Sequence, residues 1–142
     1  MIANATITIM LVDDNQADVE LTKETLADCK LRLSIVTADD GQQALDLLEA
    51  KLARQESLPD LILLDLNMPR LDGPGLLKAL RAREELKAIP VVVLTSSDAE
   101  QDIVRSYKLG ANCYVNKPVG LEEFQKIVSA IEGFWLTVVK LP

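Results

Sequence analysis

The stretch LILLDLNMPR, which runs from Leu61 to Arg70, decides how the rest of the chain is interpreted. Four apolar residues, Leu61–Leu64, lead directly to one carboxylate, Asp65. Asp is depleted in strands, and charged side chains are almost never fully buried unless they are paired. Asp65 is therefore either an ordinary strand end or a functional carboxylate. The residues that end the other predicted strands distinguish these two interpretations.

The composition is that of one soluble globular domain. Of the 142 residues, 49% are apolar and 26% are charged. The net charge of −7, without any basic stripe, argues against nucleic acid or an anionic membrane as a partner. The N-terminus has no basic leader, and no apolar run approaches the length of a membrane span, so we expect a cytoplasmic protein. Two isolated cysteines make no disulfide framework. The chain has no histidine, which excludes catalysis by histidine and metal sites with histidine ligands.

Apolar, β-branched runs alternate along the chain with segments of helical period. The predicted strands are Thr6–Val12, Leu33–Ala38, Leu61–Leu64, Val91–Thr95 and Cys113–Val115. Each is followed by apolar residues at helical spacing: Val19, Leu21, Leu26 and Cys29; Ala44, Leu45, Leu47, Leu48 and Leu52; Leu76, Leu77 and Leu80; Ile103, Val104, Tyr107 and Leu109; Phe124, Ile127, Val128 and Ile131. Residues that break regular structure predict loops at Leu58–Asp60, Asp72–Gly75, Ile89–Pro90 and Leu109–Asn112. Five strand-then-helix units predict an α/β fold, with a five-stranded parallel sheet and helices on both faces.

Polar side chains stand at the carboxyl ends of four of the five predicted strands. They are Asp13 and Asp14 after the first strand, Asp65 after the third, Thr95 after the fourth and Lys117 after the fifth. Functional residues of an open parallel sheet gather at this edge. Three neighbouring acids repel one another unless a cation lies among them, and oxygen ligands without His or Cys suit Mg²⁺. A lysine and a hydroxyl add what a phosphoryl group on a carboxylate requires, because Asp is a known nucleophile in phosphoryl transfer.

Each of these residues also has a purely structural interpretation. Asp13 and Asp14 are suited to cap the helix that follows them, and Asn67 to shape the turn before Pro69. The remaining residues have equally plain roles: Thr95 as a strand residue, Lys117 as a solvated loop charge and Tyr114 as part of the core. The coincidence of five residues of suitable type at the ends of the right strands favours the functional interpretation.

Four motifs, MLVDDN, ILLDLNMPRLDG, VVVLTSS and YVNKP, resemble those of the receiver domain of two-component response regulators. The resemblance covers Thr6–Ile131 and implies a flavodoxin-like, doubly wound sheet with strand order 2-1-3-4-5. It implies that Asp65 is the phosphoacceptor. It also implies that Mg²⁺ is held by Asp13, Asp14, Asp65 and the backbone carbonyl of Asn67, with Asp14 the more direct ligand of the acidic pair.

The same resemblance implies how the site would signal. Thr95 would be the switch hydroxyl, Tyr114 the aromatic switch residue and Lys117 the cation paired with the phosphoryl group. The Lys117–Pro118 bond would be cis, as is typical of the family. The donor would be a phosphohistidine on a partner histidine kinase, so the chain would be a phosphoacceptor and not an enzyme.

The C-terminal part of the chain carries a narrower resemblance. SYKLGANCYVNKP and FWLTVVKLP look like the small response regulators that pair with phytochrome-type histidine kinases in cyanobacteria. We interpret residues 1–142 as one stand-alone receiver domain with an apolar extension at 133–142. That extension either packs on its own domain or forms a homodimer contact through Phe134, Trp135 and Leu136.

Two other functions compete with this interpretation. A phosphatase of the haloacid-dehalogenase type also uses an Asp nucleophile and Mg²⁺, but it requires a second acid where this chain has Asn67, and its acidic pair comes last in the chain. A degenerate receiver that only binds partners would lack an acid, the Thr or the Lys, and none of these is missing.

Overall fold

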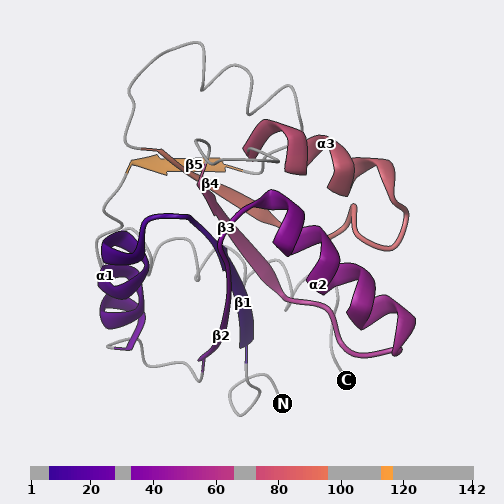
Figure 1. Ribbon diagram of the computed structural model, residues 1–142, viewed down its shortest axis with the longest axis horizontal. Coiled ribbons are helices and arrows are strands. Elements are labelled where there is room, and N and C mark those ends of the chain that lie inside the picture. The colour runs from indigo at the N-terminus through magenta and orange to yellow at the C-terminus, as the bar shows by residue number, and fades with distance from the viewer. Residues whose placement is uncertain (1–6, 28–32, 66–72, 96–112, 117–142) are drawn as a thin grey trace, which may run out of the picture.

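The computed structural model describes residues 7–27, 33–65, 73–95 and 113–116, in which strands and helices alternate (Figure 1). The elements are β1 (Ile7–Val12), α1 (Gln16–Ala27), β2 (Leu33–Ala38), α2 (Gly41–Ala53), β3 (Leu61–Asp65), α3 (Gly73–Ala82), β4 (Val91–Thr95) and β5 (Cys113–Asn116). The strands follow the predicted runs, except that β3 extends to Asp65 and β5 to Asn116, while Thr6, the predicted start of the first strand, lies outside the described residues. The fourth and fifth predicted helices lie outside the described residues.

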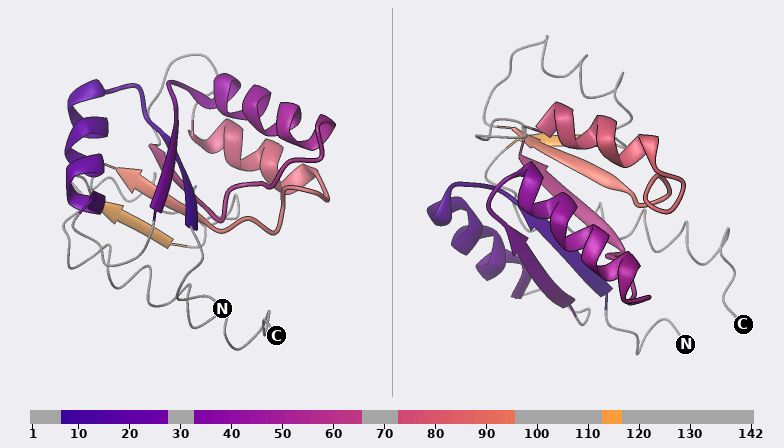
Figure 2. Two further views of the ribbon diagram at one scale, coloured as in Figure 1. Left: turned by 90° about the horizontal axis from the view of Figure 1, so that it is seen from below. Right: turned by 45° about the vertical axis from the view of Figure 1, so that its right-hand side comes forward.

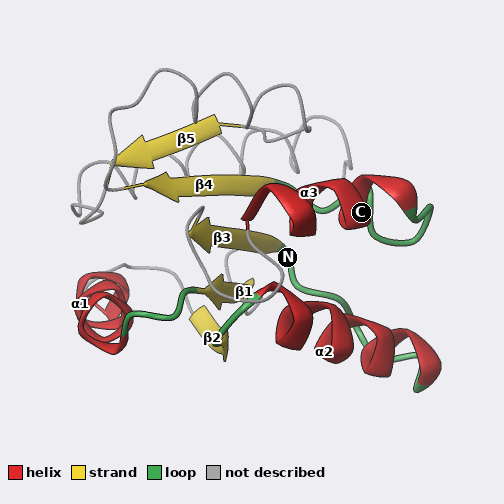
Figure 3. Ribbon diagram, turned by 45° about the horizontal axis from the view of Figure 1, so that its top comes forward, coloured by secondary structure: helices red, strands yellow, loops and turns green. Residues whose placement is uncertain are grey.

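The five strands form one parallel sheet in the order β2-β1-β3-β4-β5, which confirms the predicted topology (Figure 3). The chain passes from β1 outward to β2 and then crosses back to β3 on the other side of β1. This reversal is the switch point at which ligands bind in open α/β sheets. Because Val12 of β1 is paired with Leu64 of β3, the next residues, Asp13 and Asp65, emerge together at the carboxyl edge.

Helices cover both faces of the sheet, as predicted. On one face, Met10, Ile62 and Leu64 pack in a buried cluster with residues of α2 and α3, including Leu48 and Leu77. Successive residues of a strand point to opposite faces, so their neighbours in the sequence belong to the other cluster. That cluster joins Ile9, Leu11 and Leu63 to Val19 and Leu26 of α1. The further views in Figure 2 show the same division, with α1 on the opposite side of the sheet from α2 and α3.

Two local expectations were wrong. The segment Asp72–Gly75 was predicted to be a loop, but α3 begins at Gly73. Pro74 is compatible with this start, because the first turn of a helix leaves backbone N–H groups without intrahelical partners. In α1, Leu21 was grouped with the apolar residues but is 43% exposed. Thr22 takes the buried position, since it lies three residues after Val19 and four before Leu26.

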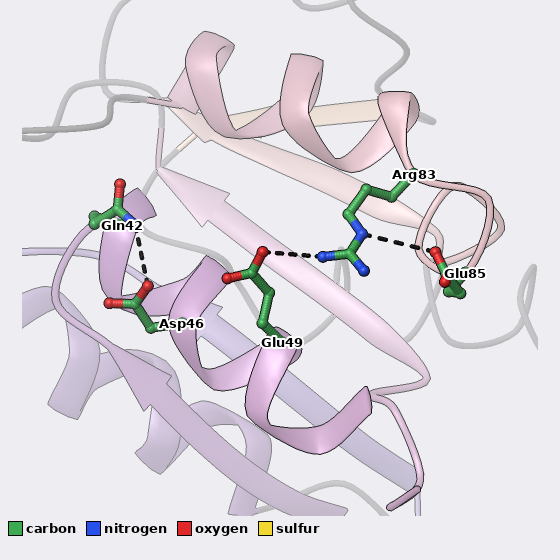
Figure 4. A network of polar contacts seen from close by, with 5 residues as sticks. All are labelled: Gln42, Asp46, Glu49, Arg83 and Glu85. Carbon is green, nitrogen blue, oxygen red and sulfur yellow. Dashed lines mark hydrogen bonds and ion pairs between the residues drawn. The ribbon is translucent and has the colours of Figure 1, made fainter. Parts of the chain in front are cut away.

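Polar contacts tie α2 to the turn that follows α3 (Figure 4). The Arg83 guanidinium lies 2.9 Å from a Glu49 carboxylate oxygen and 3.6 Å from one of Glu85. Along α2 itself, the Gln42 amide donates a hydrogen bond of 3.0 Å to Asp46. These side chains are exposed, so each pair contributes at most about 1 kcal/mol.

Buried or half-buried polar groups close the turns at the amino edge of the sheet, away from the acids. The Thr8 N–H donates to the Asp60 carboxylate at 2.9 Å, and the Asp60 N–H donates to the Thr8 carbonyl at 2.8 Å, which joins β1 to the start of β3. Arg81 donates to the carbonyls of Lys87 and Ile89 just before β4. Burial lowers the pKa of the Arg81 guanidinium, yet it stays charged at neutral pH because its ordinary pKa is so high.

Candidate metal and phosphoryl site

Three carboxylates converge at the carboxyl edge of β1 and β3. Ligand oxygens of Asp13, Asp14 and Asp65 all lie within 4.8 Å of one another. Asp13 and Asp65 are buried, with 1% and 5% of their surfaces exposed, whereas Asp14 is exposed. The fold therefore brings together the three acids predicted to form the site, and it leaves one side of the cluster open to solvent.

Hydrogen bonds hold the turn that carries the first two acids. The Asp13 N–H donates to the Ala38 carbonyl at 3.0 Å, which continues the pairing of β1 with the last residue of β2 one residue beyond the end of β1. One Asp13 carboxylate oxygen, Oδ1, accepts the Asn15 N–H at 3.0 Å. The side chain of Asp13 is thus fixed against the backbone of its own turn, two residues ahead.

Asn15 caps α1, and neither Asp13 nor Asp14 does. The Asn15 side-chain oxygen accepts the Asp18 N–H at 3.1 Å, and its carbonyl accepts the Val19 N–H at 3.0 Å. The structural alternative, in which one of the two acids was the helix cap, is therefore wrong. It failed because Asn caps a helix about as well as Asp does, and the adjacent Asn15 was not considered as a cap.

The turn after β2 carries a polar residue that sequence reasoning missed. Asp40 is buried and caps α2, and its carboxylate accepts the Gln43 N–H at 2.8 Å. The Gln43 side chain in turn accepts the Asp39 N–H. The two bonds resemble a capping box in which the N–H of Asp39 replaces the N–H of the cap residue, and an Asp followed by a Gln three residues later was the available signal. Asp40 thus has a structural role at the same edge as the three acids.

The chemistry of the cluster fits a hard divalent cation. Carboxylates this close repel one another, and burial of two of them strengthens the repulsion, so a cation among them is stabilising. The donor atoms are all oxygens, and hard cations such as Mg²⁺ and Mn²⁺ prefer oxygen ligands, whereas softer metals prefer sulfur. The exposed side, where Asp14 lies, leaves room for water or a phosphate oxygen to complete the shell. A carboxylate nucleophile beside a bound cation is suited to phosphoryl transfer.

Of the other predicted site residues, the structure describes only the backbones of Thr95 and Tyr114. Thr95 is the last residue of β4 and pairs with Asn116, and Tyr114 of β5 pairs with Val93. The structure places these backbones but does not describe the side chains of Thr95 and Tyr114. Several further predictions lie outside the described residues: Asn67, Lys117, the Lys117–Pro118 bond, Phe134, Trp135 and Leu136. The roles assigned to these residues remain predictions.

No helix within the described ranges is both long and apolar enough to cross a membrane. This result concerns residues 7–27, 33–65 and 73–95, which contain all of the described helices.

Comparison with known proteins assigns the family. The chain is 42% identical to the response regulator Rcp1 of Synechocystis sp. over 135 residues, which are 94% of this chain and 92% of that protein. The crystal structure of the phosphorylated cyanobacterial phytochrome response regulator RcpA matches with a TM-score of 0.74 and 45% identity, over 94% of this chain and 96% of that one. The Mn²⁺-bound form of Rcp1 matches with a TM-score of 0.74 and 40% identity, over 96% and 99% of the two chains. These relatives are response regulators and indicate no enzyme family. The family model for the response regulator receiver domain matches residues 9–129, and the chain belongs to this family.

Proposed function

We propose that this protein is a phosphoacceptor of two-component signal transduction, and that Asp65 receives the phosphoryl group from a partner histidine kinase. One observation carries the proposal: the Asp65 carboxylate lies within 4.8 Å of the carboxylates of Asp13 and Asp14, at the switch point of the sheet. Asp65 ends the middle strand of the sheet and is positioned by its own pairing with Leu94 of β4 and by that of the preceding residue, Leu64, with Val12 of β1.

The residues that would hold the metal are Asp13, Asp14, Asp65 and, through its backbone carbonyl, Asn67. A bound Mg²⁺ supplies positive charge that offsets the charge of the phosphoryl oxygens. An Asp65 carboxylate oxygen forms the new bond to phosphorus while the bond from phosphorus to the donor's imidazole nitrogen breaks. The imidazole keeps that electron pair and takes up a proton. Asp13, held through its own turn, keeps negative charge beside Asp65 and so favours cation binding.

The remaining predicted residues would complete and read out the modified site. Lys117 would pair with the phosphoryl group, and the Thr95 hydroxyl would donate a hydrogen bond to a phosphoryl oxygen. Tyr114 would turn inward as Thr95 moves, so that phosphorylation shifts an equilibrium between two surface conformations. The Lys117–Pro118 bond would be cis. Hydrolysis of the acyl phosphate by water would reset the protein, which acts as a switch rather than as an enzyme on other substrates.

The names of the relatives support a more specific partner. RcpA is a cyanobacterial phytochrome response regulator, so we propose a phytochrome-type histidine kinase as the donor. We further propose that residues 1–142 act as one receiver domain in the cytoplasm. In this proposal the chain forms a homodimer to which Phe134, Trp135 and Leu136 contribute.

Labelling with a small phosphodonor tests the site assignment. Acetyl phosphate with Mg²⁺ should add one phosphoryl group to the wild-type protein and none to Asp65→Asn, as measured by intact mass. Asp46→Asn, which changes an exposed acid on α2, should label like the wild type. Equal labelling of Asp65→Asn and the wild type would refute the assignment. A wild type that accepts no phosphoryl group from acetyl phosphate or from a kinase would instead indicate a receiver that only binds partners.

The partner and the dimer have separate tests. Phosphotransfer from a purified phytochrome-type histidine kinase should be faster than from an unrelated histidine kinase, and equal rates would contradict the phytochrome pairing. Light scattering should give a lower mass for a chain that ends at Gly133 than for the full chain. An unchanged mass would remove the extension from the interface.

A further inference from the structure

The exposed carboxylate of the acidic cluster belongs to Asp14. Within the described part of the chain, no hydrogen bond or ion pair reaches the Asp14 carboxylate, although it lies within 4.8 Å of Asp13 and Asp65. Like charges at this distance push an unrestrained side chain toward solvent. Among the described residues, it is therefore the backbone that holds the Asp14 carboxylate beside its neighbours.

That backbone is fixed on both sides of Asp14. On one side, the Asp13 N–H donates to the Ala38 carbonyl, which anchors the turn to β2. Across Asp14, the Asp13 Oδ1 atom accepts the Asn15 N–H at 3.0 Å, so the two flanking residues are joined over it. This three-residue turn, Asp13–Asn15, is what we call the acidic arch.

Asn15 connects the acidic arch to the first turn of α1. Its side-chain oxygen accepts the Asp18 N–H at 3.1 Å, and its carbonyl accepts the Val19 N–H at 3.0 Å. Val19 is buried against β1 and β3, so this turn of the helix is attached to the core. The arch is thus secured at one end by β2 and at the other by a helix whose first turn requires a cap.

We propose that Asn15 is a positioning residue for the divalent metal site. By capping α1 it holds its own N–H against the Asp13 carboxylate, and this keeps Asp13 and Asp14 arranged to receive one cation. Without the cap, the first turn of α1 loosens and the acidic arch becomes less ordered. The cation must then order both acids as it binds, which weakens its affinity. The inference rests on the proposed function, because it assumes that the acidic cluster holds the metal.

Titration of the protein with Mn²⁺, followed by the electron paramagnetic resonance signal of the free ion, tests this role. Loss of a residue that orients a metal ligand weakens affinity by about 10- to 100-fold, and we expect the low end, about tenfold, for Asn15→Ala because Asn15 is exposed. Asn15→Ser should bind Mn²⁺ like the wild type, since Ser caps a helix as well as Asn does.

Two further variants separate positioning from stability. Asn15→Gly removes the side-chain acceptor and frees the backbone of the acidic arch, while it costs the protein little overall stability, so it should weaken Mn²⁺ binding as Asn15→Ala does. Ile89→Val is the matched control, because it destabilises the core to an extent similar to a lost cap but lies at the amino edge of the sheet. Ile89→Val should bind Mn²⁺ with the affinity of the wild type.

The outcomes distinguish failure of this inference from failure of the proposed function. Affinities of Asn15→Ala and Asn15→Gly that match the wild type would overturn the positioning role while leaving the metal site intact. Equal weakening in Ile89→Val would also overturn it, because the effect would then follow stability alone. A wild-type protein that binds no Mn²⁺ would overturn the metal site, and the inference with it.

Discussion

Replacing Asp14 with Asn should stabilise the metal-free protein. The substitution keeps the size of the side chain and removes one charge from a cluster of three. No hydrogen bond or ion pair to the Asp14 carboxylate is lost among the described residues. The change therefore relieves repulsion from Asp13 and Asp65 without breaking a contact, and it isolates the electrostatic consequence of bringing the acids together.

The expected gain in stability follows from the distances between the three carboxylates. At 4.8 Å in a water-like dielectric, two unit charges repel by about 0.9 kcal/mol, and 0.1 M salt reduces this to about 0.5 kcal/mol. Asp14 faces two such neighbours, which gives about 1 kcal/mol as a lower bound. Burial of Asp13 and Asp65 reduces screening and raises the expected gain to about 1–2 kcal/mol. For a chain of this size the gain corresponds to a rise in Tm of about 3–6 °C.

Thermal unfolding with and without Mg²⁺ measures this effect. In excess chelator, Asp14→Asn should unfold at a higher temperature than the wild type. At about tenfold above its Kd, Mg²⁺ should stabilise the wild type by about 1.4 kcal/mol, and the variant by less because it has lost a ligand. Glu24→Gln, which removes an exposed acid from the outer face of α1, should match the wild type in both conditions. A lower Tm for metal-free Asp14→Asn, or an equal response of both proteins to Mg²⁺, would refute the reasoning.

The structure also predicts effects away from the acidic cluster. Leu63→Ala, in the middle strand and fully buried, should lower the free energy of unfolding by about 3 kcal/mol in urea melts, and a loss below about 1 kcal/mol would contradict the packing. Asp40→Ala removes the cap of α2 and should lower the free energy of unfolding by about 1–2 kcal/mol, whereas Asp40→Ser should restore most of it. Arg83→Ala breaks exposed ion pairs and should change the free energy of unfolding by less than about 1 kcal/mol, and less still in high salt. A larger, salt-independent loss would show that Arg83 contributes packing.

The architecture was predictable because several patterns agree. Continuous apolar runs, helical spacing and intervening loops each indicate alternating strands and helices, and the strand order then followed from the family resemblance. The convergence of Asp13, Asp14 and Asp65 was predictable for a related reason. Parallel strands end at one edge, so acids that follow the first and third strands meet there once those strands are neighbours.

Local details were less predictable, because neighbouring residues compete for the same role. Asp13 and Asp14 were predicted as possible caps of α1, and the structure shows that the next residue, Asn15, takes this role. Leu21 is more apolar than Thr22, but the geometry of the helix buries Thr22. Asp40 was not predicted to cap α2, because only residues suited to chemistry were sought at the strand ends. The signal for the cap was present, since Gln43 follows Asp40 by three residues.

The most direct test of the central claim is to locate the phosphoryl group in the protein. Wild-type protein treated with acetyl phosphate and Mg²⁺ is reduced with borohydride, which converts an acyl phosphate to an alcohol, and the resulting peptides are sequenced by mass spectrometry. The account predicts homoserine at position 65, with Asp13 and Asp14 unchanged. Modification of Asp13 or Asp14 in place of Asp65, or of a residue outside the acidic cluster, would contradict it.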